Sequence, residues 1–198
     1  MYLYQGGNRL NPSDVGYVLE SNYLNVLGNR VYINGEPNPF WIFYAFSMGL
    51  VGIGTSLFFY YLSLLVNHKF IQKIIILFGI ISGLAYLSMY VFSPDTNFTT
   101  HMFLNKVAHY LFMVNVVLLV FSVNREKYPV IYYSLSILFL IFILRFILLF
   151  FIKKLHFDQE TILHFKVIYQ KILVFFQLLI ASLILFRIKK NWIKYDLY

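Results

Sequence analysis

Five long apolar stretches fill most of this chain of 198 residues and constrain its fold more than any other feature. A transmembrane helix needs about 20 apolar residues, because each residue adds about 1.5 Å toward a hydrocarbon core about 30 Å thick. A water-soluble domain of this length does not require five such stretches. The chain is therefore predicted to be an all-α, polytopic transmembrane helical bundle. The five predicted spans cover residues 40–66, 70–92, 104–123, 129–152 and 165–187.

Composition agrees with this fold class and limits the chemistry. Hydrophobic residues make up 60% of the chain and charged residues only 12%, which is far from the proportions of a globular domain. No cysteine is present, so disulfides, thiolate metal sites and cysteine nucleophiles are excluded. The net charge of +8 is explained by basic loops beside a membrane. Because no soluble domain remains to present a binding surface, we expect no nucleic-acid partner.

The loop charges predict the orientation of the chain. Positive residues collect where the first, third and fifth spans end, and such ends face the cytoplasm or a matrix compartment. The opposite loops contain Asp95, Asp158 and Glu160, although Lys153 and Lys154 weaken the contrast. We therefore predict an N-out, C-in protein of the plasma membrane or an organellar inner membrane. The positive residues are His68, Lys69, Lys73, Arg125, Lys127, Arg187, Lys189, Lys190 and Lys194.

Residues 1–39 form a polar segment that we expect to cap the outer face of the membrane domain, residues 40–198. Turn-forming residues recur along it, and they predict a hairpin over residues 30–37. Tyr17, Leu24 and Ile33 are interleaved with the turns, which favours an ordered cap over a flexible tail. No signal peptide or earlier span carries the segment across a membrane. Either it translocates unaided or a preceding element is missing.

Short motifs follow one another in a particular order along nearly the whole chain. The N-terminal segment contains Gly6-Gly7-Asn8, Gly16-Tyr17, the run from Asn22 to Gly28, and Asn38-Pro39. Later come Phe92-Ser93-Pro94-Asp95, His101 and Tyr169-Gln170-Lys171-Ile172. In order and spacing they resemble the first outer loop, a later loop and a polar turn of a small prokaryotic six-span membrane family of unknown function. That family neighbours the Frag/DRAM/Sfk group.

The resemblance implies a helical bundle with a link to lipids, since the wider group is associated with lipid-anchor processing and membrane homeostasis. Two differences between this chain and that family limit what the resemblance implies. The resembled family has an additional helix before the Gly-Gly loop, and that helix is absent here. It also carries Ser-Asp where this chain has Asn25-Val26. Loss of that carboxylate argues against a catalytic role for the loop.

Five polar residues within the spans share one depth near the outer ends: Arg145, Gln170, Lys171, Lys106 and His109. Ionisable groups within a membrane are costly and usually face the bundle interior. Their positive charge predicts a pocket for the phosphate or carboxylate head of an anionic lipid, with Arg145 as a bidentate fork. The alternative is that Arg145 pairs with an acid or with carbonyl groups between helices while the lysines reach toward the interface.

Asp95 and His101 form a polar pair on an outer loop that could act as an acid and base, and His101, His109 and His164 could hold a metal. An enzyme would need a nucleophile or metal within reach, and the histidine spacing differs from the i, i+4 pattern of helical metal ligands. We therefore expect no catalytic residue, no metal site and no cofactor. Capping of the following helix by Asp95 or Thr96 is the favoured interpretation.

Glycines occur at regular positions in the first two spans. Gly79 and Gly83 form a GxxxG pair, and Gly49, Gly52 and Gly54 lie in the preceding span. Small residues let helices approach closely within a bilayer. Packing within the chain is favoured over dimerisation.

Three functional interpretations follow. The preferred one is a non-enzymatic integral membrane protein, associated with lipids or acting in membrane homeostasis, whose partners are membrane lipids, anionic lipids included. The second is an accessory structural subunit of a larger membrane complex, for example an organellar, respiratory-type complex. The third is a lipid-processing enzyme with an outer-leaflet site around Asp95 and His101.

Overall fold

The computed structural model describes residues 4–155 and 157–195 and contains one short and five long helices in that range. All five α-helices are long and apolar enough to cross a membrane, and the described residues contain no strand. The predicted all-α transmembrane fold class is therefore confirmed. The elements are the 3-10 helix η1 (Leu24–Gly28), α1 (Trp41–Ser63), α2 (Lys69–Ser88), α3 (Phe98–Ser122), α4 (Pro129–Lys154) and α5 (Gln159–Tyr195).

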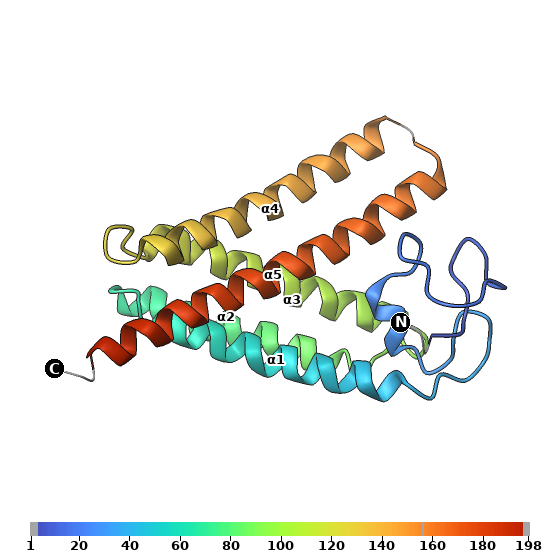
Figure 1. Ribbon diagram of the computed structural model, residues 1–198, viewed down its shortest axis with the longest axis horizontal. Coiled ribbons are helices and arrows are strands. Elements are labelled where there is room, and N and C mark those ends of the chain that lie inside the picture. The colour runs from blue at the N-terminus through green and yellow to red at the C-terminus, as the bar shows by residue number, and fades with distance from the viewer. Residues whose placement is uncertain (1–3, 156, 196–198) are drawn as a thin grey trace.

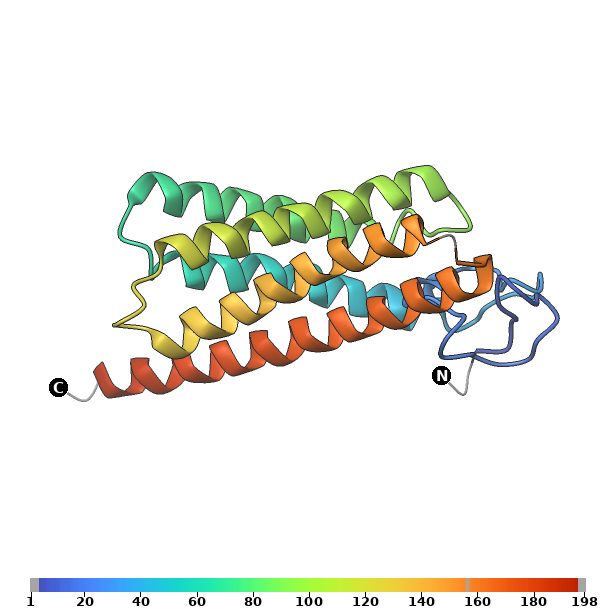
Figure 2. The same cartoon turned by 90° about the horizontal axis from the view of Figure 1, so that it is seen from above.

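The helices run side by side in alternating directions (Figure 1). The N-terminal segment shares one end of the bundle with the α2–α3 and α4–α5 loops, and the C-terminus lies at the other end. α2 packs against α1 and α3, whereas α4 packs against α3 and α5. α5 lies at the edge of the bundle along α4 (Figure 2). The side chains of residue 153 and of residues 188–195, including Lys189, Lys190 and Lys194, lie outside the described part.

Two helices begin earlier than hydropathy predicts. α3 begins at Phe98 rather than residue 104, and α5 begins at Gln159 rather than residue 165. Hydropathy marks only the part of a helix inside the hydrocarbon, and polar turns can extend the helix into the interface. His101 and His164, which were expected in loops, consequently lie in the first two turns of helices.

The residue that caps α3 also differs from the prediction. The side chain of Asn97 accepts a hydrogen bond from the Thr100 amide at 3.0 Å, as an N-cap residue does. Neither Asp95 nor Thr96 has this role. The prediction of an Asp95 or Thr96 cap is wrong because the Asp95 carboxylate binds the N-terminal segment instead.

Close packing of α1 on α2 depends on glycine. A Cβ atom added at Gly83 would lie 2.1 Å from Ser56 Oγ and 2.5 Å from the Gly52 carbonyl oxygen. A Cβ added at Gly79 would lie 2.6 Å from Phe59 Cβ. The GxxxG pair therefore packs within the chain, as predicted, and brings the two helix backbones together.

Buried polar side chains join α2 to α3. Ser82 Oγ donates to the Ala108 carbonyl oxygen at 2.9 Å, and Asn115 Nδ2 donates to the Ile75 carbonyl oxygen at 3.0 Å. Both side chains are fully buried. Such bonds between helices satisfy polar groups that have no water partner inside a membrane.

The N-terminal segment folds around a small core of its own. Tyr4, Val26 and Tyr32 are buried in it, and burial raises the pKa of the Tyr4 phenol to about 12. The predicted hairpin is present, because Val31 pairs with Pro37 and the Tyr32 amide donates to the Glu36 carbonyl oxygen at 2.8 Å. The segment thus holds a defined shape above the membrane domain.

We expect Gly83→Ala to lower the stability of the protein in detergent by about 1–3 kcal/mol, because the added methyl group overpacks the α1–α2 contact. Gly54→Ala is the matched control, since a Cβ there meets no atom within 4 Å. Both changes gain the same helix propensity. Thermal unfolding followed by circular dichroism measures the difference. Equal midpoints for the two variants would contradict the close packing.

Candidate functional site

A cavity of about 570 Å³ lies inside the membrane domain, between α1, α2, α3 and α5 and beneath η1. We call it the interior cavity; it extends from Leu24 and Leu27 of η1, past Gly54 of α1, to Leu185 of α5. A volume of this size falls within the range of about 300–1,000 Å³ that is usual for small-molecule sites. It is therefore large enough to hold a ligand.

The interior cavity opens sideways between α1 and α5. α5 packs against α4 and η1, so α1 and α5 face each other across the cavity. Leu50 of α1 is 55% exposed and Leu178 of α5 is 58% exposed, although both line the cavity. Gly54 of α1 and Ser182 of α5 also line the cavity and are exposed, which indicates an opening along the two helices. A lipid chain could enter there directly from the bilayer.

The lining of the interior cavity becomes mainly apolar along the helix axes, with Thr55, Gln177 and Ser182 as the polar residues farther from η1. Its apolar end includes Phe58, Phe112, Leu178, Ala181 and Leu185. Its polar end, next to η1, includes Asn25, His101, Asn105, His109 and Gln170. This gradient matches a molecule that has a polar head and an apolar chain.

His101 ties η1 to the loop that follows α2. Its Nδ1 lies 2.8 Å from the Phe92 carbonyl oxygen, and its Nε2 lies 3.3 Å from Asn25 Nδ2. A carbonyl oxygen only accepts, so Nδ1 donates and Nε2 accepts from the amide. A neutral imidazole satisfies both contacts. Both ring nitrogens are therefore occupied by the protein itself.

Asp95 anchors the hairpin of the N-terminal segment. Its carboxylate accepts hydrogen bonds from the Arg30 amide at 2.7 Å and the Val31 amide at 3.1 Å. Among the described residues, no hydrogen bond joins Asp95 to His101. The two members of the predicted polar pair thus hold the N-terminal segment at two separate points.

Lys171 also holds the N-terminal segment. Its ammonium group donates to the Leu19 carbonyl oxygen and, at 2.7 Å, to the Asn22 carbonyl oxygen. It lies 5.0 Å from the centroid of the Tyr17 ring, a cation–π contact with a phenol whose pKa is raised by burial. Lys171 does not line the interior cavity. Its predicted role as a lipid-headgroup ligand stays a prediction beside this observed structural role.

Two further side chains of α5 bind the same part of the chain. Gln170 Oε1 accepts from the Leu24 amide at 3.1 Å, and His164 Nε2 lies 3.1 Å from Ser21 Oγ. Gln170 differs from Lys171 because it also lines the interior cavity. The N-terminal half of α5 thus anchors η1 and the residues before it.

The remaining residues of the predicted headgroup site lie apart from one another. Lys106 is exposed, and neither Lys106 nor Arg145 lines the interior cavity. Arg145 is half-buried on α4, and its guanidinium makes no hydrogen bond or ion pair with another described residue. Burial raises the pKa of Tyr23, and the Arg145 charge acts in the opposite direction. Of the five predicted residues, only His109 and Gln170 line the cavity.

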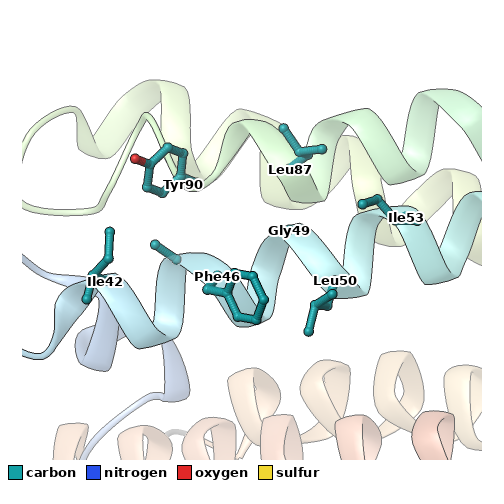
Figure 3. Close-up of a pocket in the computed structure, with 8 residues that line it drawn as sticks. Ile42, Phe46, Gly49, Leu50, Ile53, Leu87 and Tyr90 are labelled. Atoms are coloured by element: carbon teal, nitrogen blue, oxygen red, sulfur yellow. The ribbon is translucent and has the colours of Figure 1, made fainter.

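A second hollow of about 410 Å³, which we call the surface groove, lies between α1 and the C-terminal end of α2. In Figure 3, Leu87 of α2 and Tyr90, just beyond the end of α2, lie on one side of it, and Ile42, Phe46 and Gly49 of α1 lie on the other. The only polar side-chain atom in its lining is the Tyr90 hydroxyl oxygen. The groove is open above Gly49, where a Cβ atom would meet nothing within 4 Å.

Several cavity residues were missed in the sequence analysis. Tyr44, Tyr86, Asn105 and Gln177 line the interior cavity, and none was a candidate. Asn105 and Gln177 could have been identified from the sequence, because both carry polar amides inside predicted spans. The rule that flags charged groups within a membrane also applies, more weakly, to uncharged amides.

The described residues contain no group of three His, Asp or Glu side chains placed to hold a metal ion. No protein family matches the chain, and no curated protein or solved structure is detectably similar to it. The resemblance to the six-span family therefore stays a prediction.

We expect Lys171→Met to release residues 17–24 from α5, because it removes both carbonyl contacts and the contact with Tyr17. Limited proteolysis should cleave this segment faster, while the helices stay intact. Lys166→Met is the matched control, since Lys166 is exposed on the same helix. Equal cleavage rates in both variants would show that Lys171 does not hold the segment.

Proposed function

We propose that this integral membrane protein is non-enzymatic and binds an amphiphilic lipid in its interior cavity. The observation that carries the proposal is the graded lining of the cavity, which is polar beneath η1 and apolar toward Leu185. The lateral opening between α1 and α5 gives a lipid a route that avoids water. The head would lie near Asn25 and His109, and the chain along Phe58 and Leu185.

The contacts made by the candidate catalytic groups support binding without catalysis. Both nitrogens of His101 and the carboxylate of Asp95 are engaged in contacts that hold the N-terminal segment. A general acid or base must be free to exchange a proton with a substrate. Neither group is available for that without loosening the segment.

A second candidate, an accessory structural subunit of a larger membrane complex, is favoured by the surface groove. Ala45 and Gly49 give the groove a small-residue floor on the membrane-facing side of α1. Small residues of this kind allow a helix of another protein to approach closely. If other protein chains copurify with the wild-type protein but not with the Gly49→Leu variant, this candidate would be supported.

We expect Gly54→Leu to reduce the lipid that copurifies with the protein by about tenfold or more. Gly54 lines the interior cavity and has free space at its Cβ position, so a leucine would occupy the space of the lipid chain. Gly49→Leu is the matched control, because it adds the same side chain to the same helix in the surface groove. Native mass spectrometry in a mild detergent measures the retained lipid.

Ser182→Leu offers a second way to fill the cavity, from α5, if Gly54→Leu does not fold. A folded cavity-filling variant that keeps the full amount of lipid would refute the proposed site.

The proposed N-out, C-in orientation can be tested directly because the chain has no cysteine. Val15 is 87% exposed in the N-terminal segment, and Glu126 is exposed in the α3–α4 loop. We expect Val15→Cys to react with a membrane-impermeant maleimide on intact cells. Glu126→Cys should react only after permeabilisation. The reverse pattern would mean that the basic loops face outward.

A further inference from the structure

We infer that the lipid bound in the interior cavity has an uncharged head that bears a hydroxyl group. This inference rests on the proposed function and adds the chemical class of the ligand. It departs from the anionic head predicted from the sequence.

Charge is absent from the walls of the interior cavity. None of its lining residues is Asp, Glu, Lys or Arg. The three cations proposed for a headgroup site are elsewhere: Lys171 binds backbone carbonyls, Lys106 is exposed, and Arg145 does not line the cavity. A phosphate or carboxylate in the cavity would therefore have no counter-charge.

η1 lies over the polar end of the cavity, so a head bound there has less contact with bulk water. Leu24, Asn25 and Leu27 of η1 form part of its lining. Gln170 and Lys171 hold η1 and the residues before it against α5. Removing an unpaired charge from water is far more costly than removing a hydrogen-bonded neutral group. The enclosure therefore favours an uncharged head.

His109 supplies a hydrogen-bond acceptor at this end of the cavity. Its Nδ1 lies 2.8 Å from the Asn105 carbonyl oxygen, which only accepts, so Nδ1 carries the proton. In a neutral ring, Nε2 is then an acceptor. It has no hydrogen-bond partner among the described residues, and the His109 side chain lines the cavity.

The Tyr86 side chain holds this imidazole in place. The Tyr86 ring packs edge-on against it, with the ring centroids 5.6 Å apart. An unpaired neutral acceptor calls for a donor on the ligand, and a hydroxyl group is the uncharged donor that lipid heads commonly carry.

Gln177 offers a second polar contact deeper in the cavity. It lies seven residues beyond Gln170 on α5, which is about 10 Å along the helix. Its Nε2 is buried with no hydrogen-bond partner, and its amide makes no other bond to a described residue. Rotation of the amide exchanges its donor and acceptor ends. The group can therefore bond the ester oxygens that join a lipid head to its chain.

Three lipids with the same oleoyl chain separate the possibilities. They are 1-monooleoylglycerol, which has hydroxyl groups; 1-oleoyl lysophosphatidic acid, which has a phosphate; and methyl oleate, which has neither. We expect the monoglyceride to bind about tenfold tighter than the lysophosphatidic acid. It should bind about fivefold tighter than methyl oleate, as one neutral hydrogen bond allows. Competition measured by native mass spectrometry on delipidated protein gives the order. Equal or tighter binding of either competitor would overturn the inference.

The His109 contact can be tested with the same lipids. His109→Phe should weaken monoglyceride binding about fivefold and leave methyl oleate binding unchanged. His109→Gln, which keeps an acceptor atom, should restore the tighter binding of the monoglyceride relative to methyl oleate. Lys106→Leu, one turn away on an exposed position of α3, is the matched control. Equal weakening of both lipids by His109→Phe would mean that His109 is structural, and the inference would fail.

Failure of this inference can be told apart from failure of the proposed function. If all three lipids bind the wild-type protein and are lost together in Gly54→Leu, the cavity is a lipid site whatever head it prefers. If none of them binds and Gly54→Leu retains the same lipids as the wild-type protein, the cavity is not a lipid site.

Discussion

The close contact between α1 and α2 determines where the interior cavity lies. Gly52 and Gly83 bring the two helix backbones together, and this commits one face of α1 to α2. The face that carries Gly54 and Thr55 is then left toward α5, which packs against α4 and η1 instead. Because Gly54 has no side chain to fill the gap, the space between α1 and α5 stays open. The same helix thus uses one glycine to close a contact and another to leave a cavity.

The polar residues at the helix ends next to the N-terminal segment serve mainly to hold that segment. Lys171 and Asp95 bind backbone groups of this segment, as cation and anion respectively. Such charged groups can stay at the membrane surface without pairing with each other, because carbonyl and amide dipoles replace water as their partners. This arrangement fixes η1 above the cavity and leaves the neutral side chains His109 and Gln170 to line it.

Hydropathy predicted the five spans because the hydrocarbon core imposes a minimum apolar length. It did not predict the polar first turns of α3 and α5, which lie beyond that core. Depth along a span was also predictable, and Gln170 and His109 do lie at one end of the same cavity. The direction in which each side chain points around the helix axis could not be predicted. Adjacent residues differ by about 100°, so Gln170 lines the cavity while Lys171 faces carbonyl groups about 150 residues earlier in the chain. No local pattern identifies such a partner.

The positive charge of the chain is compatible with an uncharged cavity. Attraction to a charged membrane surface acts over a long distance, whereas binding in a cavity depends on direct contacts. Basic residues such as Lys69, Arg125 and Lys127 lie at the end of the bundle opposite η1. They can attract an anionic membrane surface without any pocket, since that attraction acts over about a Debye length. A site inside the bundle must instead match each polar atom with a partner, because an unpaired charge there is costly. A composition rich in lysine and arginine therefore gives information about the membrane face of this protein, whereas ligand selection in the proposed site would depend on uncharged groups such as His109 and Gln177.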